Sequence, residues 1–453
     1  MGQSPFAEAV TRRHGGDTEN ARRLTSWGKA ARQVSRDLVE NRALIMRVFL
    51  PFVVGYYLSY LFRTINALIA APLASELRLG ADELGLLTSV YFLTFAAAQI
   101  PIGILLDRYG PRRIQSALLV VAAFGAALFA SSDNFLALIA GRALIGLGVA
   151  ASLTAGLKAL VLWFPRDRLP FLNGLMIMLG ALGAVTATSP TELLLAWMGW
   201  RELFVLFAAV TGVCAFMIYL VVPEVGPSTP ITSRAVLASL RKIFADPRFW
   251  RLAPLSATSI GTAWALQGLW AAQWLTDVEG LDRAALVRYL FTMAAALSLG
   301  ALLLGVLADR LRRHGVGPEA LLGAVAAVFM TAQIALILRW PLPSYILWAI
   351  VAAVGAATVL SYAILAEYFP KEFAGRANAT LNVFHIGGAF VLQYVTGVVL
   401  ALWTSQAGHY PEIAYQTAFA LNLALQIAAW VWFALPWTFP RASTVCPAHP
   451  SEL

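Results

Sequence analysis

Charged residues are scarce in this sequence: Asp, Glu, Lys and Arg make up 13% of its 453 residues, whereas hydrophobic residues make up 59%. Soluble domains carry about 25% charged residues, so this composition predicts a chain that faces lipid. The net charge of +9 does not indicate nucleic-acid binding, because the basic residues flank apolar segments. The two cysteines, Cys214 and Cys446, form neither a disulfide framework nor a metal-binding spacing.

The motifs of common enzyme classes are also lacking. We find no phosphate-binding loop, no cluster of metal ligands and no nucleophile motif in the sequence. The first 45 residues are polar and lack the apolar run of a cleavable signal peptide. We therefore expect neither an enzyme nor a protein with a cofactor or metal.

Long apolar segments are abundant. A membrane-spanning helix needs about 20 such residues at a rise of about 1.5 Å each. Twelve segments meet this length, and they predict an all-α membrane protein with twelve transmembrane helices. They run roughly over 48–74, 84–106, 114–131, 136–163, 170–194, 202–222, 250–274, 285–307, 319–339, 344–367, 377–402 and 414–436.

The twelve segments fall into two sets of six, separated by a stretch rich in Pro, Gly and Ser. We expect a basic N-terminal segment, two pseudo-symmetric six-helix bundles, a linker and a C-terminal tail. Their predicted bounds are 1–47, 48–224, 225–247, 248–436 and 437–453.

The loops between the segments alternate in charge. Loops rich in Arg, such as those around Arg112 and Arg312, alternate with acidic or neutral loops, such as those around Glu83 and Asp277. Cytoplasmic loops carry an excess of Lys and Arg. We therefore expect both termini and the basic loops in the cytoplasm, and a multi-pass protein of the inner (plasma) membrane.

One short hydrophilic turn, Gly103-Ile-Leu-Leu-Asp107-Arg108-Tyr-Gly110-Pro-Arg112-Arg113, joins the second and third segments. A related stretch, Gly305-Val-Leu-Ala-Asp309-Arg310-Leu-Arg-Arg-His-Gly315, follows about 200 residues later. We name these stretches the first and second loop motifs. They resemble the Gly-x-Leu-x-Asp-Arg-x-Gly-x-Arg-Arg signature of the major facilitator superfamily.

The resemblance implies a secondary active transporter whose two halves bind a small solute between them. It also implies that the loop motifs hold a gate in one conformation and release it in the other. The predicted gating residues are Gly103, Asp107, Arg108, Gly110, Arg112, Asp309 and Arg310. The simpler alternative is that Asp107 caps a turn and the arginines only set topology. We expect Gly103 to let a neighbouring helix approach closely and Gly110 to allow a sharp turn.

Further stretches fit the same family. Arg142-Ala-Leu-Ile-Gly146-Leu-Gly148 resembles its fourth-helix motif, and Gly199-Trp200-Arg201 resembles the stretch before its sixth helix. The halves also resemble each other, since Phe164-Pro165 recurs as Phe369-Pro370, 205 positions later. Parallel repeats of this kind place the substrate near the middle of the membrane.

Basic residues inside the spans are the main candidates for substrate binding, because an ionisable residue there costs about 2.5 kcal/mol or more. Arg63 lies deep in the first span, and Tyr56, Tyr60 and Asn66 lie on or near its helical face. We expect Arg63, Tyr60 and Asn66 to line a substrate cavity. The alternative is a buried structural ion pair, for which no acidic partner is visible in mid-membrane.

The fourth span carries two more cations. Arg142 and Lys158 are sixteen residues apart, so they point in nearly opposite directions and cannot both face the cavity. Arg142 matches the family motif, and we expect it to bind substrate. For Lys158 we keep two interpretations open: it reaches the cytoplasmic surface, or it meets the acidic gate residues.

The second half presents aromatic and amide groups instead. Gln267, Trp270 and Trp274 fall on one face of the seventh span, and we expect Gln267 and Trp270 to shape the cavity. His385, in the eleventh span, either takes up a proton during transport or is a packing histidine.

The predicted cavity thus combines cations on one side with aromatic and amide groups on the other, and no Asp or Glu lies deep in a span. Such a cavity suits a small organic anion, such as a carboxylate or an amino-acid- or peptide-like compound. We expect alternating access driven by proton symport or anion exchange, in a protein that is a monomer in the lipid bilayer. The alternatives are an exporter of amphipathic metabolites or drugs, and a protein of this fold that no longer transports and acts as a sensor or assembly partner.

Overall fold

The computed structural model describes residues 44–165, 168–224, 233–406 and 408–435. Most of the predicted N-terminal segment, part of the predicted linker and the tail lie outside these residues. The described part is helical apart from turns and one isolated bridge between Gln406 and His409. These findings confirm the all-α fold class.

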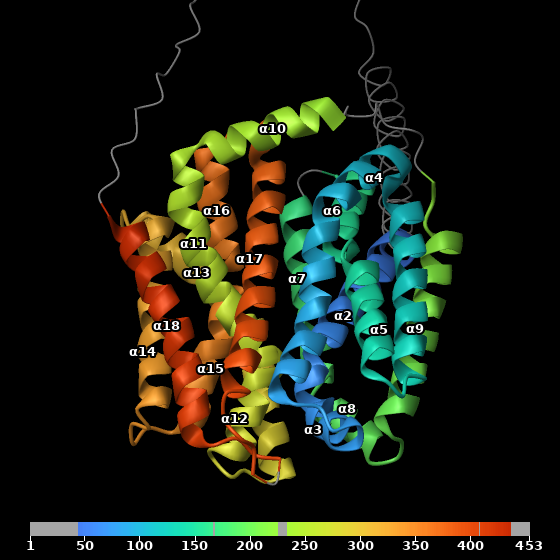
Figure 1. Cartoon of the computed structure of the whole chain (residues 1–453). Helices are drawn as coiled ribbons and strands as arrows, with labels where there is room; N and C mark the ends of the chain where they lie inside the picture. The colour runs from blue at the N-terminus through green and yellow to red at the C-terminus, as the bar shows by residue number, and fades with distance from the viewer. Residues whose placement is uncertain (1–43, 166–167, 225–232, 407, 436–453) are drawn as a thin grey trace, which may run out of the picture.

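The first group of helices ends before the linker and lies on the right in Figure 1. It comprises η1 (Ile45–Phe49), α2 (Leu50–Thr64), α3 (Asn66–Leu77), α4 (Ala81–Ala130), α5 (Phe135–Val149), α6 (Ser152–Trp163), α7 (Leu169–Thr186), α8 (Ser189–Leu195) and α9 (Trp200–Val221). We call this group the N-terminal half.

The second group lies on the left in Figure 1, with α10 along its upper end. It comprises α10 (Ser233–Ala245), α11 (Pro247–Ala265), η3 (Leu266–Trp270), α12 (Ala271–Asp277), α13 (Arg283–Arg313), α14 (Pro318–Ile337), α15 (Ser344–Val354), η4 (Gly355–Ala357), α16 (Thr358–Tyr368), α17 (Lys371–Leu400) and α18 (Glu412–Ala434). We call this group the C-terminal half.

Ten helices of the described residues are long and apolar enough to cross a membrane. One of them, α4, has 50 residues and bends at Gly110, where the backbone has φ 79° and ψ 164°. A positive φ of this size favours glycine, so the sharp turn expected at Gly110 is present. The count of twelve spans stays a prediction, because it counts α4 twice and adds the continuous helical stretch from Pro247 to Asp277.

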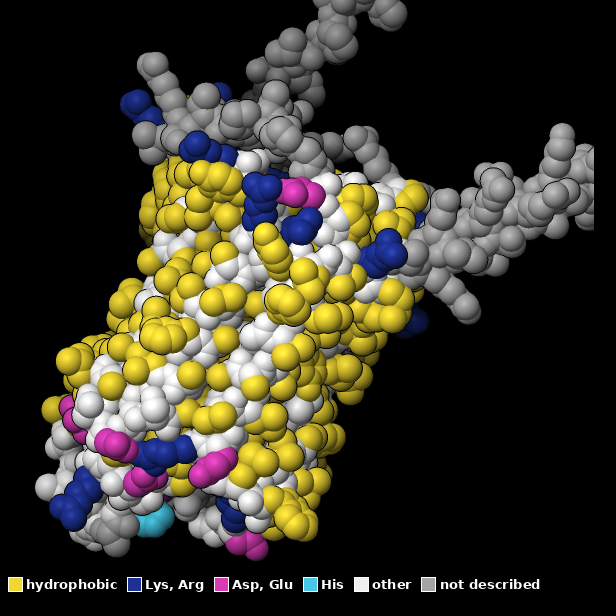
Figure 2. All heavy atoms as spheres, turned by 90° about the vertical axis from the view of Figure 1, so that its right-hand side faces the viewer, with side chains coloured by type: hydrophobic (Ala, Val, Ile, Leu, Met, Phe, Trp, Pro, Cys, Tyr) yellow, Lys and Arg dark blue, Asp and Glu magenta, His cyan; other side chains and the backbone are white. Residues whose placement is uncertain are grey.

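A broad band of hydrophobic side chains covers the face of the molecule shown in Figure 2, with charged side chains gathered above and below it. Many large apolar side chains point outward in this way, among them Phe124, Phe216 and Leu303, each at least 61% exposed. In a soluble protein such a surface would be unusual. The band is what a helical bundle surrounded by lipid presents, and the protein is a multi-pass membrane protein.

Glycine allows close packing where α5 meets α4. A Cβ added at Gly146 would lie 2.3 Å from the carbonyl oxygen of Tyr91, and one added at Gly148 would lie 2.3 Å from the amide nitrogen of Ala122. These contacts explain the two glycines after Arg142. Gly103 behaves differently, because nothing lies within 4 Å of a Cβ added there. Our expectation of a close helix approach at Gly103 was therefore wrong.

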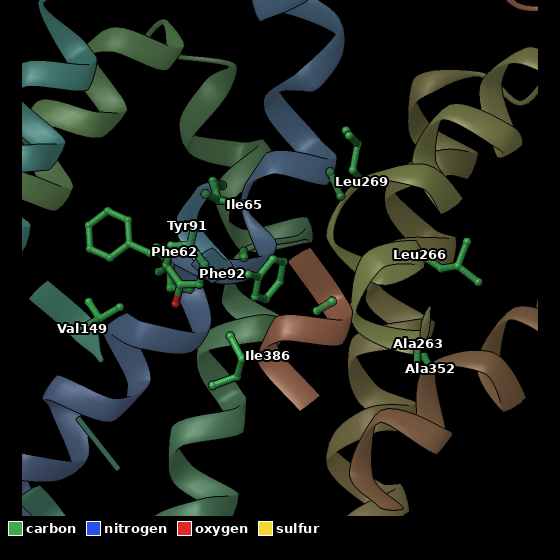
Figure 3. Close-up of a cluster of buried hydrophobic side chains, with 14 of the residues drawn as sticks. Phe62, Ile65, Tyr91, Phe92, Val149, Ala263, Leu266, Leu269, Ala352 and Ile386 are labelled. Atoms are coloured by element: carbon green, nitrogen blue, oxygen red, sulfur yellow. The ribbon is translucent and has the colours of Figure 1, made fainter. Parts of the chain in front are cut away.

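The two halves pack against each other through α4 and α17. A Cβ added at Gly85 would lie 3.2 Å from the Cα atom of Gly397. Further along the same helices, Phe92 and Ile386 lie close together in Figure 3, beside Phe62 and Tyr91. The region next to these residues holds the candidate site.

Candidate functional site

A cavity of about 120 Å³ lies between the two halves. Helices α2, α4, α6 and α7 line it from the N-terminal half, and α11, α16 and α17 line it from the C-terminal half. We call it the central cavity. Its polar and aromatic lining includes Tyr56, Tyr60, Arg63, Gln99, Trp264, Tyr362 and Asn382.

Arg63 brings a positive charge to the central cavity. Its guanidinium carbon lies 4.1 Å from the ring centroid of Tyr60 and 4.7 Å from that of Trp264. Its Nη2 atom is buried and has no hydrogen-bond partner. No Asp or Glu is among the described residues that line the cavity. Cation–π contacts supply only part of the stabilisation that an anion would give, so Arg63 can accept an anionic ligand.

Tyr60 lines the cavity as predicted, next to Tyr56 on the same helix. Their rings meet edge to face with centroids 5.1 Å apart, and the two hydroxyl groups are 3.5 Å apart. Asn66 lies one turn beyond Arg63, at the start of α3, where it is buried and its Nδ2 atom has no partner. It is not part of the cavity lining in this conformation.

Arg142 does not line the central cavity, contrary to the expectation from the sequence. The side chain is fully buried, and its guanidinium carbon lies 5.2 Å from the ring centroid of Tyr91. Its Nη1 donates a hydrogen bond of 3.2 Å to the carbonyl oxygen of Phe62, the neighbour of Arg63. The close approach of α5 to α4 at Gly146 encloses this side chain behind Tyr91, and it contacts the segment that carries Arg63.

Trp270 also lies outside the central cavity, and Trp264 takes the place expected for it. The Trp270 indole is buried, and its Nε1 donates to the carbonyl oxygen of Gln393 over 3.0 Å. Residues Leu266–Trp270 form the π-helical turn η3, which inserts an extra residue and rotates the face that follows. Gln267 lies within this turn, buried, with its Nε2 atom unpartnered. A wheel with constant α-helical spacing cannot predict this rotation.

His385 packs behind the cavity lining. Its ring centroid is 5.7 Å from that of Tyr362 and 6.4 Å from that of Trp264, and both of these residues face the cavity. The His385 side chain is fully buried, and neither ring nitrogen has a hydrogen-bond partner. A packing histidine normally satisfies at least one nitrogen, so the unsatisfied ring favours a functional role.

The first loop motif is held within the N-terminal half. Lys158 Nζ lies 2.6 Å from Asp107 Oδ1 and also donates to the carbonyl oxygen of Leu106 over 2.7 Å. Of the two interpretations for Lys158, the structure agrees with the contact to the acidic gate residue Asp107. Arg112 donates to the carbonyl oxygen of Tyr219 over 2.8 Å. We call this end of the molecule the motif side.

The remaining residues of the loop motifs are more exposed. Arg113 pairs with Glu224 just past α9, and the guanidinium carbon of Arg108 lies 5.2 Å from the ring centroid of Tyr109. Asp309 and Arg310 of the second motif are exposed. Within the described residues, the ion pair nearest to them joins Arg312 and Glu367 over 3.7 Å. The two motifs therefore differ in their contacts despite their similar sequences.

The opposite end of the molecule joins the two halves directly. Arg283 of α13 forms a two-pronged ion pair with Glu192 of α8, at 2.8 and 2.6 Å, and donates to the carbonyl oxygen of Leu68 over 3.1 Å. The amide nitrogen of Ala81 donates to the hydroxyl oxygen of Tyr410 over 3.0 Å. We call this end the Glu192 side, because its contacts hold the halves together there.

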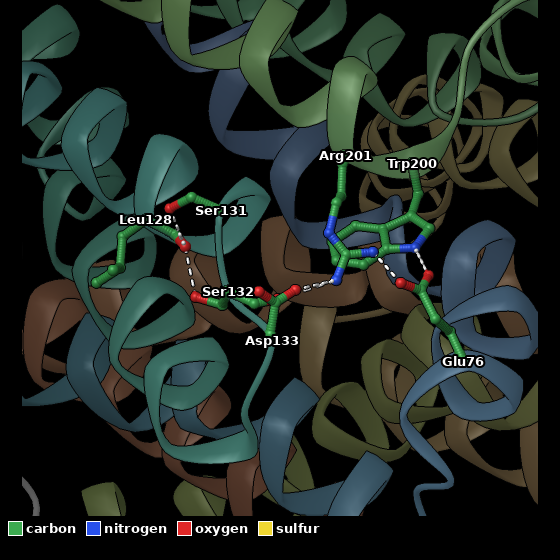
Figure 4. A network of polar contacts seen from close by, with 7 residues as sticks. All are labelled: Glu76, Leu128, Ser131, Ser132, Asp133, Trp200 and Arg201. Atoms are coloured by element: carbon green, nitrogen blue, oxygen red, sulfur yellow. Dashed lines mark hydrogen bonds and ion pairs between the residues drawn. The ribbon is translucent and has the colours of Figure 1, made fainter.

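Trp200 and Arg201 tie three segments of the N-terminal half together (Figure 4). The Trp200 indole donates to Glu76 over 2.7 Å, and Arg201 pairs with Glu76 and, over 2.9 Å, with Asp133. The hydrogen bond from Trp200, followed by the contact with Arg201, lowers the pKa of the Glu76 carboxyl. The Gly-Trp-Arg stretch thus joins α3, α9 and the loop between α4 and α5.

Sequence reasoning missed several residues of the site. Gln99, Tyr362 and Asn382 line the central cavity, and Tyr362 donates to Asn382 over 2.9 Å. Gln99 stands alone in an apolar run, whereas Tyr362 and Asn382 have polar neighbours in the sequence, and neither pattern marks a residue that lines a cavity. The pairing of Glu192 with Arg283 joins residues 91 positions apart and has no local signal.

Comparisons with known proteins find similar sequences. The chain is 28% identical over 157 residues to a probable sulfoacetate transporter of Cupriavidus necator, covering 34% of this chain and 36% of that protein. It thus spans about a third of the length of this relative. A chloramphenicol resistance protein of Streptomyces lividans is 26% identical over 374 residues, covering 80% of this chain and 92% of that protein.

A solved structure shares the fold. It is the crystal structure of a bacterial homolog of the human lysosomal transporter Spinster in an inward-facing and unoccupied conformation. The two share 19% sequence identity with a TM-score of 0.70, and the match covers 85% of this chain and 95% of that one. The family model of the Major Facilitator Superfamily matches residues 52–392. The chain therefore belongs to the Major Facilitator Superfamily, a family of transporters.

Proposed function

We propose that this protein carries small organic anions across the membrane by alternating access between its two halves. The observation that carries the proposal is Arg63, a cation with a buried unpartnered nitrogen at a cavity whose described lining includes no acidic residue. The carboxylate, sulfonate or phosphate of a substrate would complete its pairing. The similarity to a probable sulfoacetate transporter supports an anionic substrate.

The remaining cavity groups would shape the site around the bound anion. Tyr60 and Trp264 hold the guanidinium between their rings and offer an apolar surface to the substrate's body. Arg142 would act as a positioning residue, since it bonds the backbone next to Arg63. Asn66, Gln267 and Trp270 would contact substrate only after the Glu192 side opens.

The two ends of the molecule would act as alternating gates. The hydrogen bonds described above between the halves lie on the Glu192 side, so substrate would exchange through the motif side in this conformation. We propose that the motif side faces the cytoplasm, because its loops are the basic ones. Asp107 and Lys158 are paired in this conformation, so they would stabilise the first loop motif while that side is open.

Coupling would come from a proton or from a second anion. His385 supports a proton, because its unpartnered ring packs on two residues of the cavity lining. Protonation of His385 would add a second positive charge near a bound anion. Anion exchange is the other possibility and needs no titrating residue. We propose that a single chain suffices, since the cavity lies within one copy.

A second candidate function is export of amphipathic compounds. It is favoured by the similarity to a chloramphenicol resistance protein over most of both chains and by the aromatic lining of the cavity. In this case Arg63 would be a structural cation held by two rings. The two candidate functions predict different effects on ligand binding when the charge of Arg63 is removed.

The test is a binding screen by thermal stabilisation of the purified protein in detergent, with the native chain and Arg63→Ala. The probes are acetate, sulfoacetate, phosphate, amino acids, and neutral or cationic amphiphiles. A ligand that binds the folded state raises its apparent melting temperature. We expect anions to stabilise the native protein, and Arg63→Ala to reduce their affinity at least tenfold, since a charge-assisted hydrogen bond is worth about 1.5–3 kcal/mol.

Arg288→Ala serves as the matched control, because Arg288 is an exposed arginine of α13 away from the cavity. It should bind anions as the native protein does. Arg63→Lys keeps the charge but not the planar geometry, and should retain part of the affinity. If amphiphiles stabilise the native protein and Arg63→Ala equally, and anions do not stabilise either, the anion proposal is wrong and the exporter stands.

A further inference from the structure

Three helices of the central cavity continue past its closed end into buried amide side chains. In each of these stretches of chain a cavity-lining residue is followed, three or seven positions later, by one such amide. The pairs are Arg63 and Asn66, Trp264 and Gln267, and Ile386 and Gln393. We name Asn66, Gln267 and Gln393 the amide layer. All three segments run from the central cavity toward the Glu192 side, so the amide layer lies between the cavity and that side.

The amide layer is buried and poorly satisfied. Asn66 and Gln267 are 6% exposed and Gln393 is 0% exposed. The Nδ2 of Asn66, the Nε2 of Gln267, and both polar atoms of the Gln393 side chain have no hydrogen-bond partner. Buried polar groups are nearly always bonded, because leaving one unpaired costs about 1–3 kcal/mol. Several unpaired amide atoms in one region therefore indicate a ligand.

A packing role explains amides elsewhere in the same half but not here. Gln333 and Gln426 are as deeply buried as Gln393, yet each donates to the other, over 2.8 and 3.1 Å. Gln426 also donates to Thr262 over 3.2 Å. The side-chain amides of Gln333 and Gln426 are thus bonded to each other, whereas both polar atoms of the Gln393 side chain lack a partner.

Gly268 lies between the side chain of Gln393 and the backbone of Arg63. A Cβ added at Gly268 would lie 3.7 Å from Gln393 Oε1 and 3.9 Å from the carbonyl oxygen of Arg63. Gly268 belongs to η3, and π-helical turns often mark functional sites. The Trp270 indole donates to the carbonyl oxygen of Gln393, one turn before the contact of Gly85 with Gly397. The amide layer therefore adjoins both the backbone of Arg63 and the contact that closes this side.

We propose that the amide layer, with Gln393 at its centre, binds the hydroxyl groups of the transported anion when the Glu192 side opens. An amide offers both a donor and an acceptor, which matches a hydroxyl group and not a plain hydrocarbon chain. The inference rests on the proposed function, because it places the anionic group of the same substrate on Arg63. It narrows the substrate class to hydroxylated organic anions.

The test uses two six-carbon monocarboxylates that differ in their hydroxyl groups, gluconate and hexanoate, with the native protein, Gln393→Leu and Arg63→Ala. Affinities come from thermal stabilisation over a concentration series. The native protein should bind gluconate more tightly than hexanoate. Gln393→Leu should lower the affinity for gluconate about tenfold, because the substrate's hydroxyl group loses its hydrogen-bond partner. The affinity for hexanoate should stay unchanged. Arg63→Ala should weaken both.

The ligand-free proteins provide a second readout. Gln393→Leu removes unsatisfied polar atoms and should raise the apparent melting temperature, whereas Gln333→Leu breaks a satisfied pair and should lower it. Gln333→Leu should keep the native preference for gluconate. The inference is overturned if Gln393→Leu weakens both probes equally or neither, or if the native protein binds hexanoate as tightly as gluconate. If no anion binds the native protein, the proposed function fails and this inference fails with it.

Discussion

Arg63 and Arg142 show how neighbours decide what one residue type does. Both are arginines within the predicted spans of the N-terminal half, but Arg63 lies at a cavity and Arg142 lies behind Tyr91. The glycines after Arg142 bring α5 close to α4, and the Arg142 side chain is fully buried there. Burial of a charge without full pairing is costly, and the one side-chain hydrogen bond described for Arg142 goes to the backbone beside Arg63.

Glu76 makes stability depend on pH at its contacts with Trp200 and Arg201. Its folded-state pKa lies below the usual value of 4.5, so its contribution is complete above that pH and is lost as pH falls through the lower, folded pKa. Glu76→Gln should lower stability at pH 7 and reduce the loss on acidification. The measurement is the apparent melting temperature of both proteins between pH 3 and pH 7.

The control for this prediction is Glu412→Gln, because Glu412 faces Arg339 over a longer distance of 3.6 Å. Its removal should change the melting temperature little, as for most exposed ion pairs. An acid-induced loss of stability that is the same in Glu76→Gln and in the native protein would contradict the assignment to Glu76.

At the scale of single elements, the close contact of α5 with α4 is the clearest target. Gly146→Ala would place a Cβ 2.3 Å from the carbonyl oxygen of Tyr91, so the helices must separate. We expect a loss of about 3 kcal/mol in the free energy of unfolding, at the upper end for overpacked sites. The measurement is the midpoint of unfolding in a mild denaturing detergent.

Gly174→Ala in α7 is the matched control, because nothing lies within 4 Å of a Cβ added there. Alanine is the better helix former, so this variant should be unchanged or gain about 0.5–1 kcal/mol. Equal effects of the two substitutions would mean that helix propensity, and not the contact with Tyr91, determines the result.

Much of the fold could be predicted from the sequence, but the direction in which individual side chains point could be predicted only in part. Apolar length predicted the spans, and the depth of Arg63 in the first span predicted its place at the cavity. The exchange of Trp270 for Trp264 arose from the π-helical turn η3, which depends on how α11 packs on neighbouring helices. Gln393 was missed because an isolated glutamine in an apolar run gives no sign of whether its amide is bonded.

At the scale of the whole molecule, the Glu192–Arg283 ion pair is one of the contacts that hold the two halves together on this side. The side chains are 29% and 39% exposed, so the pair is worth about 1 kcal/mol. Glu192→Gln should therefore raise the ratio of open to closed molecules on this side about fivefold. Spin labels at Trp197→Cys and Arg288→Cys, both exposed positions, would report the opening as a longer distance.

A charge exchange provides the control. Glu192→Arg alone should open this side further, because two arginines then face each other. Glu192→Arg combined with Arg283→Glu should restore part of the closed population, since the pair is rebuilt in reverse. If the double variant stays as open as the single one, the closure depends on the other contacts of Arg283, such as its bond to Leu68.

The lone charge of Arg63 has an electrical consequence. A bound monoanion would make the cavity neutral, whereas the empty cavity keeps a positive charge in a region of low dielectric constant. When the halves rock, the empty carrier moves this charge relative to the membrane field, at a cost of up to about 2.3 kcal/mol per 100 mV. Voltage would then act on the return of the empty carrier, and it would act on the loaded step as well if His385 carries a proton.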